Sequence, residues 1–409
     1  MSSSVSYDVI VIGAGPAGAA AAIVAARGGA SVLVFDKAPY GRDKVCGDGL
    51  TPRAVGALNE LKIELDDAHQ IDGLRMIAGK KTRELLWPKT ARFPPHGAVW
   101  PRRRLDAALM DAAAEAGAEV RWETEAIPEF DDDGRVIGIK AANQSYSADM
   151  VVVATGAPGQ VARMLGADRD KDEPFGIAIR TYAETPRHAD RHLEACLTLK
   201  DEHGTAVPGY GWMFPAGDGT VNIGVGALST MKNFKKLNLN NLLASYRAQV
   251  EPTWQIGPNL ERPMAWRLPM STQKRHGPGW VAIGDAAGLV NPMNGEGIDY
   301  GLESGILAAE LFLQNPDSAP ERYDTQIGLR FDSFLRTGRR FSFLIGHPFI
   351  LRNGLRLAVG TDAIANITLG VMGNLVDSET PGAAGKVLTF ADKALAVADP
   401  LLRRTRAAS

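Results

Sequence analysis

The sequence predicts an α/β (α+β composite) protein in which a doubly wound parallel sheet is interrupted by an antiparallel sheet and followed by helices. An apolar strand, a glycine-rich turn, a helix and a second strand open the chain within residues 8–36. Short strands punctuated by glycine fill residues 175–267, and a buried-strand pattern returns at 280–284. We therefore expect a discontinuous parallel-sheet domain at residues 1–70, 96–165 and 275–325, an antiparallel-sheet domain at 71–95 and 166–274, and a helical region at 326–409.

Composition and charge describe an ordinary globular chain. The 409 residues are 45% hydrophobic and 22% charged, which excludes a disordered chain. Lys and Arg number 45 against 47 Asp and Glu, so the formal net charge of −2 argues against a nucleic-acid partner. Cys46 and Cys196 have no paired or metal-ligand spacing, which predicts free thiols, no metal site and a cytoplasmic location. The sequence has no apolar run of about 18 residues, so we expect no transmembrane helix.

The first motif is a glycine-rich turn between a buried strand and a helix. Residues 9–12 are apolar and lead into Gly13-x-Gly15-x-x-Gly18, which opens an alanine-rich helix. Gly13 permits the tight turn, Gly15 lets a pyrophosphate approach the backbone, and Gly18 lets helix and strand pack closely. The helix N-terminus adds N–H donors for the phosphates. This context predicts a Rossmann-type dinucleotide site.

The second strand, residues 31–35, ends in Asp36, which is placed to hydrogen-bond a ribose hydroxyl. An acid there argues against an NADP 2′-phosphate but does not separate NAD from FAD. Hydrophobic patterns then predict a helix at 105–116, strands at 119–130, 135–141 and 148–154, and antiparallel strands at 176–182, 192–199 and 220–227.

A second glycine-rich segment follows strand 280–284, where Asp285 precedes a loop that opens a long helix. With the first motif, it resembles the FAD-binding pattern of the group that includes para-hydroxybenzoate hydroxylase. The resemblance implies that Asp285 contacts the ribityl chain and that the helix N-terminus stabilises the anionic reduced flavin. Arg102 takes the place of that group's FAD-contacting arginine, although a solvated arginine at a helix start is the alternative. The remaining residues expected at FAD are Ala17, Lys37, Arg42, Cys46, Gly47, Gly156, Gly284, Gly295, Gly297 and Ile298.

One missing motif and two further segments indicate which family of flavoproteins this sequence resembles most. The Asp-Gly motif of flavin hydroxylases is replaced here by Thr155-Gly156. Segment 42–53, which contains Cys46-Gly-Asp-Gly, and segment 208–215 are similar to motifs of the geranylgeranyl reductase family, flavoproteins that saturate C=C bonds in isoprenoid chains. Within that family the motifs look most like those of bacterial menaquinone reductases, which reduce one isoprene unit of the menaquinone side chain. The resemblance covers about residues 5 to 315.

The resemblance implies an FAD-dependent oxidoreductase that adds a hydride from reduced flavin and a proton to an isoprenoid C=C bond. The lipid substrate is menaquinone or, as the alternative, a geranylgeranyl diphosphate or lipid. Tyr210, Trp212 and Phe214 alternate in a predicted strand, so their rings share one face and can hold a prenyl chain and a cationic carbon. An ordinary sheet core is the other interpretation of this pattern. Pro208 and Pro215 suggest a sheet edge or a bend.

The proton donor and the electron donor stay open. Cys46 is a candidate for protonation or for shaping the substrate tunnel, and Asp48, Tyr210 and Glu296 compete with it as acids. No second dinucleotide motif is present, so the electron donor is NAD(P)H or another reductant.

Two rival functions remain. A flavin-dependent halogenase or monooxygenase would share the fold, and a halogenase Trp-x-Trp-x-Ile-Pro motif resembles segment 210–215, with Lys80 or Lys81 imitating its lysine. A non-catalytic flavin-binding protein is the second rival.

The C-terminal region suggests peripheral contact with the inner face of the cell membrane. Arg336 with Arg340, and Arg352 with Arg356, are spaced i, i+4 among phenylalanines and aliphatic residues. Anionic headgroups would meet the arginines while the acyl boundary receives the apolar face. An ordinary helical cap over the flavin domain is the alternative.

Overall fold

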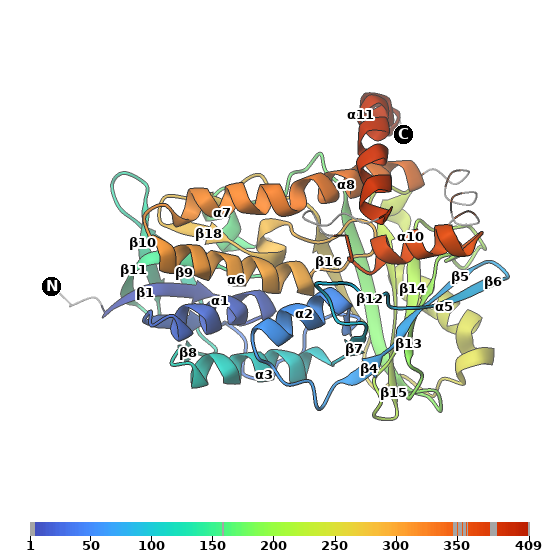
Figure 1. The fold of residues 1–409 in the computed structure, drawn as a ribbon, viewed down its shortest axis with the longest axis horizontal. Helices are drawn as coiled ribbons and strands as arrows, with labels where there is room; N and C mark the ends of the chain where they lie inside the picture. Colours follow the sequence, from blue (N-terminus) through green and yellow to red (C-terminus); the bar gives the residue numbers. More distant parts are fainter. Residues whose placement is uncertain are drawn as a thin grey trace.

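The computed structural model describes residues 5–157, 159–346, 350, 354, 357, 359–376 and 383–407. Its first layer is the predicted parallel sheet, and α1, which lies between α3 and α6, covers one face (Figure 1). The parallel strands run in the order β18 (Trp280–Ala282), β11 (Gln144–Val153), β1 (Val5–Ile12), β2 (Val32–Phe35) and β8 (Glu119–Arg121). The helices are α1 (Pro16–Arg27), α3 (Arg102–Glu115) and α6 (Ile298–Gln314).

Three strands extend this sheet by antiparallel pairing: β17 (His276–Gly277), β9 (Ala126–Phe130) and β10 (Val136–Ala141). The single strand predicted over residues 119–130 is wrong, because the chain turns through Glu123, whose φ is +53°. The segment therefore divides into β8, which joins β2, and β9, which pairs with β10.

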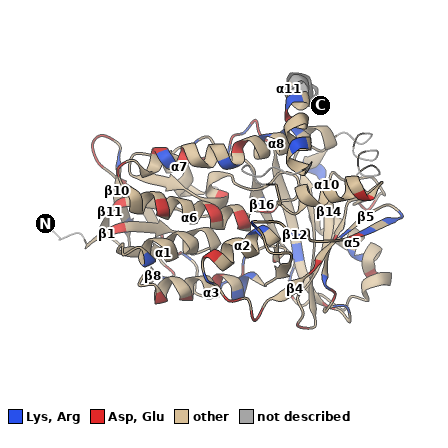
Figure 2. Cartoon of the chain, in the orientation of Figure 1, with Lys and Arg blue, Asp and Glu red and all other residues tan. Residues whose placement is uncertain are grey.

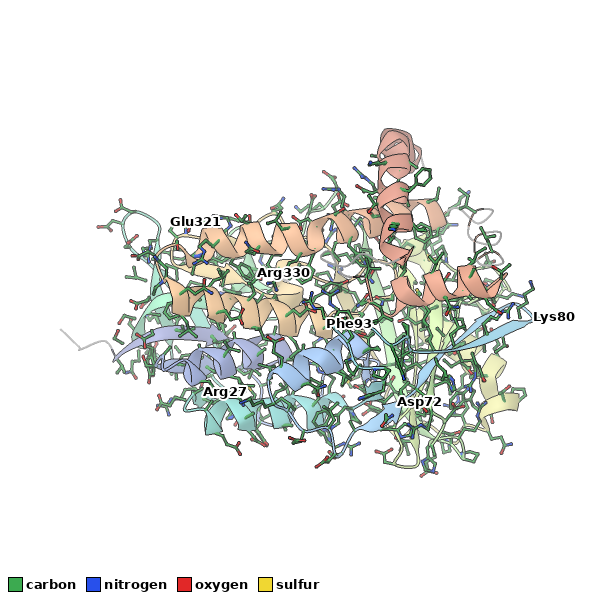
Figure 3. The ribbon with its side chains drawn as sticks, viewed as in Figure 1. Arg27, Asp72, Lys80, Phe93, Glu321 and Arg330 are labelled. Carbon is green, nitrogen blue, oxygen red and sulfur yellow. The ribbon has the colours of Figure 1, made fainter. Side chains whose placement is uncertain are left out.

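The second layer is a seven-stranded sheet packed against the end of the first. Its strands run in the order β16 (Met264–Pro269), β12 (Phe175–Glu184), β15 (Thr220–Leu228), β14 (Gly209–Pro215), β13 (His192–Cys196), β5 (Gly73–Ala78) and β6 (Lys81–Leu86). Helix α5 (Leu239–Trp254) buries Leu242, Tyr246 and Trp254 against one face. Lys80 lies at the exposed tip of the β5–β6 hairpin, at the far end of the molecule (Figure 3). Acidic and basic residues mix over both layers (Figure 2).

Shorter elements connect the layers. A small sheet combines β3 (Gly49–Leu50), β7 (Gly97–Val99) and β4 (His69–Ile71), and the helices α2 (Pro52–Glu60) and α4 (Gln160–Met164) follow β3 and β11. Single turns of 3-10 helix lie at Phe234–Lys236 and Gly284–Ala287.

The described residues after 318 are mostly helical. Helix α7 (Ala319–Ile327) continues through a π turn at Gly328–Asp332 into α8 (Ser333–Ile345). Helix α10 (Asp362–Met372) and helix α11 (Ala383–Ala407) follow, and α11 packs on α8 and α10 and projects from the body (Figure 1). Within the described part of the chain, none of these helices is both long and apolar enough to cross a bilayer.

Close packing of α1 and α6 brings the two glycine-rich motifs together. A Cβ atom added at Gly305 in α6 would lie 2.3 Å from the carbonyl oxygen of Ala17 in α1. The two helices can approach this closely only because that position carries no side chain. Segments nearly 300 residues apart therefore meet at one end of the parallel sheet.

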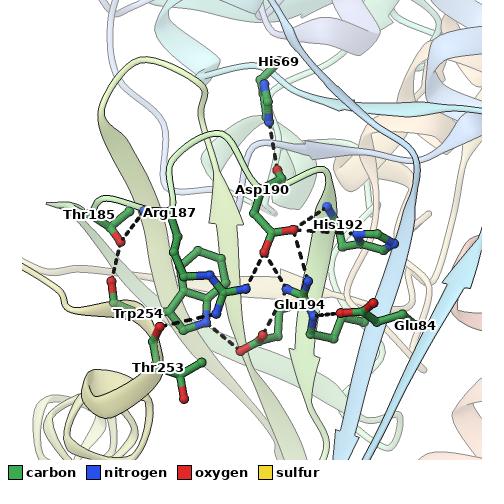
Figure 4. Close-up of polar contacts among 10 residues, drawn as sticks. His69, Glu84, Thr185, Arg187, Asp190, His192, Glu194, Thr253 and Trp254 are labelled. Carbon is green, nitrogen blue, oxygen red and sulfur yellow. Dashed lines mark hydrogen bonds and ion pairs between the residues drawn. The ribbon is translucent and has the colours of Figure 1, made fainter.

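A buried charged cluster stabilises the second sheet (Figure 4). The Arg75 guanidinium forms two hydrogen bonds to Asp190, at 2.9 and 3.2 Å, and one to Glu194 at 3.4 Å. Arg187 also donates to Asp190, and the Trp254 indole donates to Glu194 at 2.9 Å. The cluster thus ties β5, β13 and α5 together.

We expect Arg75→Met to lower the free energy of unfolding by about 3–5 kcal/mol, because it leaves two buried carboxylates without their shared cation. The side chains of Arg75, Asp190 and Glu194 are only 10%, 11% and 2% exposed. Chemical denaturation measures the loss. Glu84→Gln is the matched control, since Glu84 pairs with the same arginine at 2.7 Å but is half exposed and should cost less than about 1 kcal/mol. Equal losses in both variants would contradict this expectation.

Candidate active site

One cavity of about 1130 Å³ lies between the two sheets and reaches the C-terminal helices. Pockets for a single small ligand usually measure about 300–1,000 Å³. This cavity therefore has room for a cofactor and a second molecule.

The three glycines of the first motif have different surroundings. A Cβ added at Gly13, whose φ is +114°, would lie 2.3 Å from the Ala154 carbonyl oxygen, and one at Gly18 would lie 1.9 Å from the Gly13 oxygen. These two positions are needed to build the turn. At Gly15 the nearest atoms are the guanidinium ends of Arg42 and Arg102, 3.7 and 3.9 Å away. The space at Gly15 therefore faces two cations, as an entering diphosphate requires.

Arg102 is buried at the start of α3, so the alternative of a solvated arginine is wrong. Its guanidinium donates two hydrogen bonds to Asp106, at 2.7 and 2.8 Å, and Arg42 reaches the same carboxylate at 3.2 Å. Asp106 thus holds both guanidinium groups at the cavity beside Gly15.

Asp36 follows β2 and is nearly buried where it lines the cavity. The backbone N–H groups of Ala14 and Ala38 each donate to its carboxylate at 2.8 Å. An ionised carboxylate has about four acceptor positions, so Asp36 still has capacity for a ribose hydroxyl. Lys37 lies beside it at the exposed rim.

The second motif reaches the same cavity from the other side. Strand β18 leads into Gly284 and Asp285, and α6 begins at Ile298 with its N-terminus at the cavity. Ala17, Gly156, Gly295 and Gly297 also line this part. The hydroxyl of Thr155, next to Gly156, is buried and finds no hydrogen-bond partner among the described residues.

These observations fit a bound dinucleotide. The open space at Gly15, the paired arginines, the helix N-terminus and the unpartnered Thr155 hydroxyl each offer what such a ligand needs. Residues predicted from two distant motifs therefore line one cavity.

The Cys46 loop lies deeper in the cavity and is built around Asp48. The Asp48 carboxylate accepts hydrogen bonds from the Tyr182 hydroxyl, from Asn222 Nδ2 at 2.8 Å and from the Arg102 backbone N–H at 3.2 Å. Burial raises the pKa of Asp48 to about 6, against the lowering effect of these donors. Burial likewise raises the pKa of the Cys46 thiol to about 11, so Cys46 stays a neutral thiol.

The three aromatic side chains of β14 lie in a row on one face, as predicted. The ring centroids of Tyr210 and Trp212 are 5.8 Å apart, and those of Trp212 and Phe214 are 6.2 Å apart. All three rings line the cavity. The predicted sheet edge is wrong, because β14 pairs with β13 on one side and β15 on the other. Pro208 and Pro215 mark the ends of an interior strand, where a missing N–H is tolerated.

The aromatic strand and the Cys46 loop are joined directly. The Trp212 indole donates to Asn222 Oδ1 at 2.9 Å, and Asn222 Nδ2 donates to the Cys46 carbonyl at 2.8 Å. A Cβ atom at Gly47 would lie 2.9 Å from the Phe214 ring. The loop therefore lies flat on the aromatic wall.

Sequence reasoning missed several residues of the site. Strand β12 contributes Tyr182 and Arg180, and strand β15 contributes the Asn222 side chain. These residues occupy single strand positions without any spacing signal. Arg180 binds Asp43, in the loop before Cys46, at 2.6 Å. Lys44 also lines the cavity, and its Nζ lies 4.2 Å from the Trp266 ring centroid. Burial lowers the pKa of Lys44 to about 8.

Several known proteins are similar to this chain in sequence or fold. The family described as FAD binding domain matches residues 6–312. A solved structure of a geranylgeranyl bacteriochlorophyll reductase-like protein from Thermoplasma acidophilum superposes with a TM-score of 0.74 at 24% identity, over 91% of this chain and 98% of that chain. The predicted fold class, with its Rossmann-type FAD domain of the para-hydroxybenzoate hydroxylase group, is confirmed.

Two curated relatives align over most of their length. The menaquinone reductase of Mycolicibacterium smegmatis is 38% identical over 379 residues, which are 91% of this chain and 92% of the relative. Digeranylgeranylglycerophospholipid reductase 3 of Methanosphaera stadtmanae is 30% identical over 352 residues, 80% and 85% of the two chains. The chain therefore carries an FAD-binding domain and belongs to the geranylgeranyl reductase family of FAD-dependent oxidoreductases, together with these two reductases.

Proposed function

We propose that this protein is an FAD-dependent reductase that saturates one isoprene unit of the menaquinone side chain. The observation that carries the proposal is the continuity of the cavity. It runs from Gly15 and Asp285, past Cys46 and the aromatic wall of β14, into a branch between α8, α10 and α11. One molecule bound at the dinucleotide end can therefore meet a long apolar chain that enters from the other end.

The branch between the C-terminal helices is lined by apolar side chains. They are Phe341 and Ile345 of α8, Ile364, Ile367 and Val371 of α10, and Val387, Leu388 and Leu395 of α11. Thr337 and Thr368 also line this branch, but their hydroxyls donate to the carbonyls of Ser333 and Ile364 in their own helices. Such a lining desolvates a prenyl chain and offers little to a polar aromatic substrate. This feature favours an isoprenoid over the small substrates of hydroxylases.

Each group of residues has a proposed role. The backbone at Gly15, with Arg42 and Arg102, would hold the diphosphate of FAD, and Asp36 and Asp285 would bind its sugar and ribityl hydroxyls. When bound in its reduced form, FAD supplies a hydride. Tyr210, Trp212 and Phe214 would exclude water from the alkene and stabilise positive charge on carbon with their ring faces. Cys46, a neutral thiol, would shape the wall beside them.

Rival chemistries have less support. Neither Lys80 nor Lys81 lines the cavity, since both lie in the exposed β5–β6 hairpin (Figure 3), so neither imitates a halogenase lysine. A digeranylgeranyl lipid or geranylgeranyl diphosphate is the second candidate substrate, because the same apolar branch suits any prenyl chain.

The deciding experiment uses protein that has been reduced with dithionite under anaerobic conditions, so that the identity of the natural electron donor, NAD(P)H or another reductant, does not matter. Menaquinone and geranylgeranyl diphosphate are supplied separately, and products are analysed by mass spectrometry. Any menaquinol is first reoxidised to the quinone in air, and we then expect a gain of about two mass units in the side chain of menaquinone, one for each added hydrogen. A gain in geranylgeranyl diphosphate alone would move the proposal to the second substrate. In a parallel incubation with oxygen, products of about sixteen additional units would contradict both.

Peripheral binding to an anionic membrane is a second proposal, with a basis different from the predicted arginine face. Arg336 and Arg340 both bind Asp392 of α11, at 3.5 and 2.7 Å, and Arg339 binds Glu173, so these arginines join parts of the protein. Arg352 and Arg356 lie outside the described residues. Arg336 and Arg340 therefore share one face of α8, as predicted, but this face meets α11, and Arg336 keeps 47% of its side chain exposed.

The mouth of the apolar branch supports membrane contact instead. Leu357 and Val387 line the cavity and are also 63% and 46% exposed, and Phe390 beside them is 76% exposed. Lys386 and Lys393, four and three residues from Phe390, put cations on the same face of α11. A lipid-dissolved quinone could enter the cavity directly from such a surface.

Vesicle flotation measures this contact. We expect the FAD-loaded protein to float with anionic vesicles at low salt, and the double variant Val387→Ser with Phe390→Ser to float at least about tenfold less. Leu329→Ser is the matched control, because Leu329 is an equally exposed apolar residue in the π turn and does not line the cavity. Equal flotation of all three proteins, or none of the wild type, would contradict this proposal.

A further inference from the structure

We infer that Glu296 is the acid that protonates the alkene carbon, an inference that rests on the proposed reductase function. Glu296 belongs to the loop between Gly284–Ala287 and α6, and it lines the cavity between the cofactor end and the aromatic wall. Glu296 combines this position with a carboxyl group that forms no ion pair among the described residues.

The Glu296 loop is held against the aromatic strand. The Tyr210 hydroxyl donates to the Asn294 carbonyl at 2.6 Å, and the Glu296 backbone N–H donates to Asn294 Oδ1 at 2.8 Å. The Asn291 N–H closes the loop by donating to the Glu296 carbonyl at 2.8 Å. The carboxyl group therefore projects from a fixed backbone next to the ring of Tyr210, as proton transfer at a defined atom requires.

The Glu296 carboxyl group is poorly compensated as an anion. Its Oε1 accepts one hydrogen bond, from the Ile298 N–H at 3.3 Å, and no Lys, Arg or His of the described residues forms an ion pair with it. Burial raises its pKa well above the ordinary glutamate value, and the charges of Asp299 and Asp285 raise it further. The Ile298 N–H and Arg102 act in the opposite direction. The balance favours the protonated form of the carboxyl group.

The other acids at the cavity are less suited to the step. Asp48 accepts three hydrogen bonds, so its oxygens serve the loop structure and its pKa of about 6 leaves it mostly ionised at neutral pH. Burial raises the pKa of Cys46 to about 11 and that of Tyr210 above its usual range, which makes both weaker acids. The Tyr210 proton is also engaged by the Asn294 carbonyl.

The step balances in protons and electrons. One alkene carbon takes the carboxyl proton of Glu296 as the C=C π bond breaks, and the other carbon takes the hydride of the dithionite-reduced flavin. Glu296 is left as a carboxylate and the flavin is left oxidised. A side cavity of about 50 Å³ between Glu296, Tyr210 and Phe214 has room for water, which can return a proton to the carboxylate.

Single-turnover kinetics test the assignment. The FAD-loaded, dithionite-reduced protein is mixed anaerobically with menaquinone, and saturated product and flavin absorbance are followed together. We expect Glu296→Gln to slow product formation by about 10²–10⁴-fold while FAD stays bound and is still reduced by dithionite. Glu296→Asp should recover part of the rate, and Cys46→Ser should lose less than Glu296→Gln. With wild type, the rate should fall as pH rises through the raised pKa of Glu296, and this fall should be absent in the Gln variant.

The groups that face Glu296 and affect this profile are Asp285, Asp299, Arg102, Cys46, Tyr210 and Tyr300. A readout independent of turnover is the infrared carbonyl band of a protonated carboxylic acid, which should be present in the oxidised protein and missing in Glu296→Gln. A Gln variant as fast as wild type, or an unchanged infrared band, would overturn the inference. A wild-type protein that reduces neither menaquinone nor geranylgeranyl diphosphate would overturn the proposed function itself.

Discussion

Gly15→Val should yield a folded, colourless protein that binds FAD at least about 100-fold more weakly than wild type, a loss of about 2.7 kcal/mol or more in binding free energy. A Cβ atom at Gly15 meets no protein atom closer than the Arg42 guanidinium at 3.7 Å. The backbone there has φ −83° and ψ −179°, which valine adopts without strain. The new side chain therefore harms only the ligand that must approach the backbone. Flavin absorbance and thermal unfolding measure the two properties.

Gly18→Val is the matched control, because the same side chain there would lie 1.9 Å from the Gly13 carbonyl oxygen. It should destabilise the domain itself and reduce the yield of folded protein. A yellow Gly15→Val preparation with a normal FAD content would contradict the proposed place of the diphosphate. A Gly15→Val protein that fails to fold would contradict the open space seen at that glycine.

The nucleotide end of the site could be predicted because its signals are local. The turn between the first strand and the first helix contains Gly13, Gly15 and Gly18. Each glycine is required for a steric reason, and their short spacing is enough to identify the motif. Asp285 could be added through the family resemblance, because it follows a buried strand and precedes a glycine-rich loop that opens a helix. The structure brings both motifs to one cavity.

The substrate end could be predicted only in part. The alternation of Tyr210, Trp212 and Phe214 identified a common face, but nothing in the spacing indicated that β14 lies in the middle of its sheet. Strand order depends on pairings between residues far apart in the sequence. The hydrogen bonds of Asn222 and Tyr182 to Asp48 depend on the same pairings, so the spacing of residues did not reveal these contacts.

In the C-terminal helices, composition alone could not predict which residues face outward. Arginines among phenylalanines suit a membrane surface and an internal seam equally well, and the deciding residue, Asp392, lies more than fifty positions from Arg336 and Arg340. Their ion pairs join α8 to α11, and other residues of these two helices line the apolar branch. The exposed apolar residues come instead from the mouth of that branch.

Trp212→Ala should lower the turnover of a prenyl substrate by about 100-fold while FAD stays bound. The Trp212 ring lines the cavity, is 5% exposed and lies so close to β15 that a Cβ at Gly224 would be 2.1 Å from it. A desolvated ring face stabilises a cation by about 2 kcal/mol or more, which alone is a factor of about 30 in rate. Loss of the ring also leaves the prenyl chain loosely held, which adds to this factor.

Trp212→Phe separates the ring from its hydrogen bond. It keeps an aromatic face on the wall but removes the indole N–H that donates to Asn222, and Asn222 in turn holds the Cys46 carbonyl. If the ring face carries the effect, Phe should retain most of the activity and Ala should lose it, with a larger change in kcat than in KM. If positioning of the Cys46 loop dominates, Phe should be as impaired as Ala. Loss of flavin from the Ala variant would instead mean that Trp212 belongs to the structural core, because removing a large core side chain costs about 3–5 kcal/mol of stability.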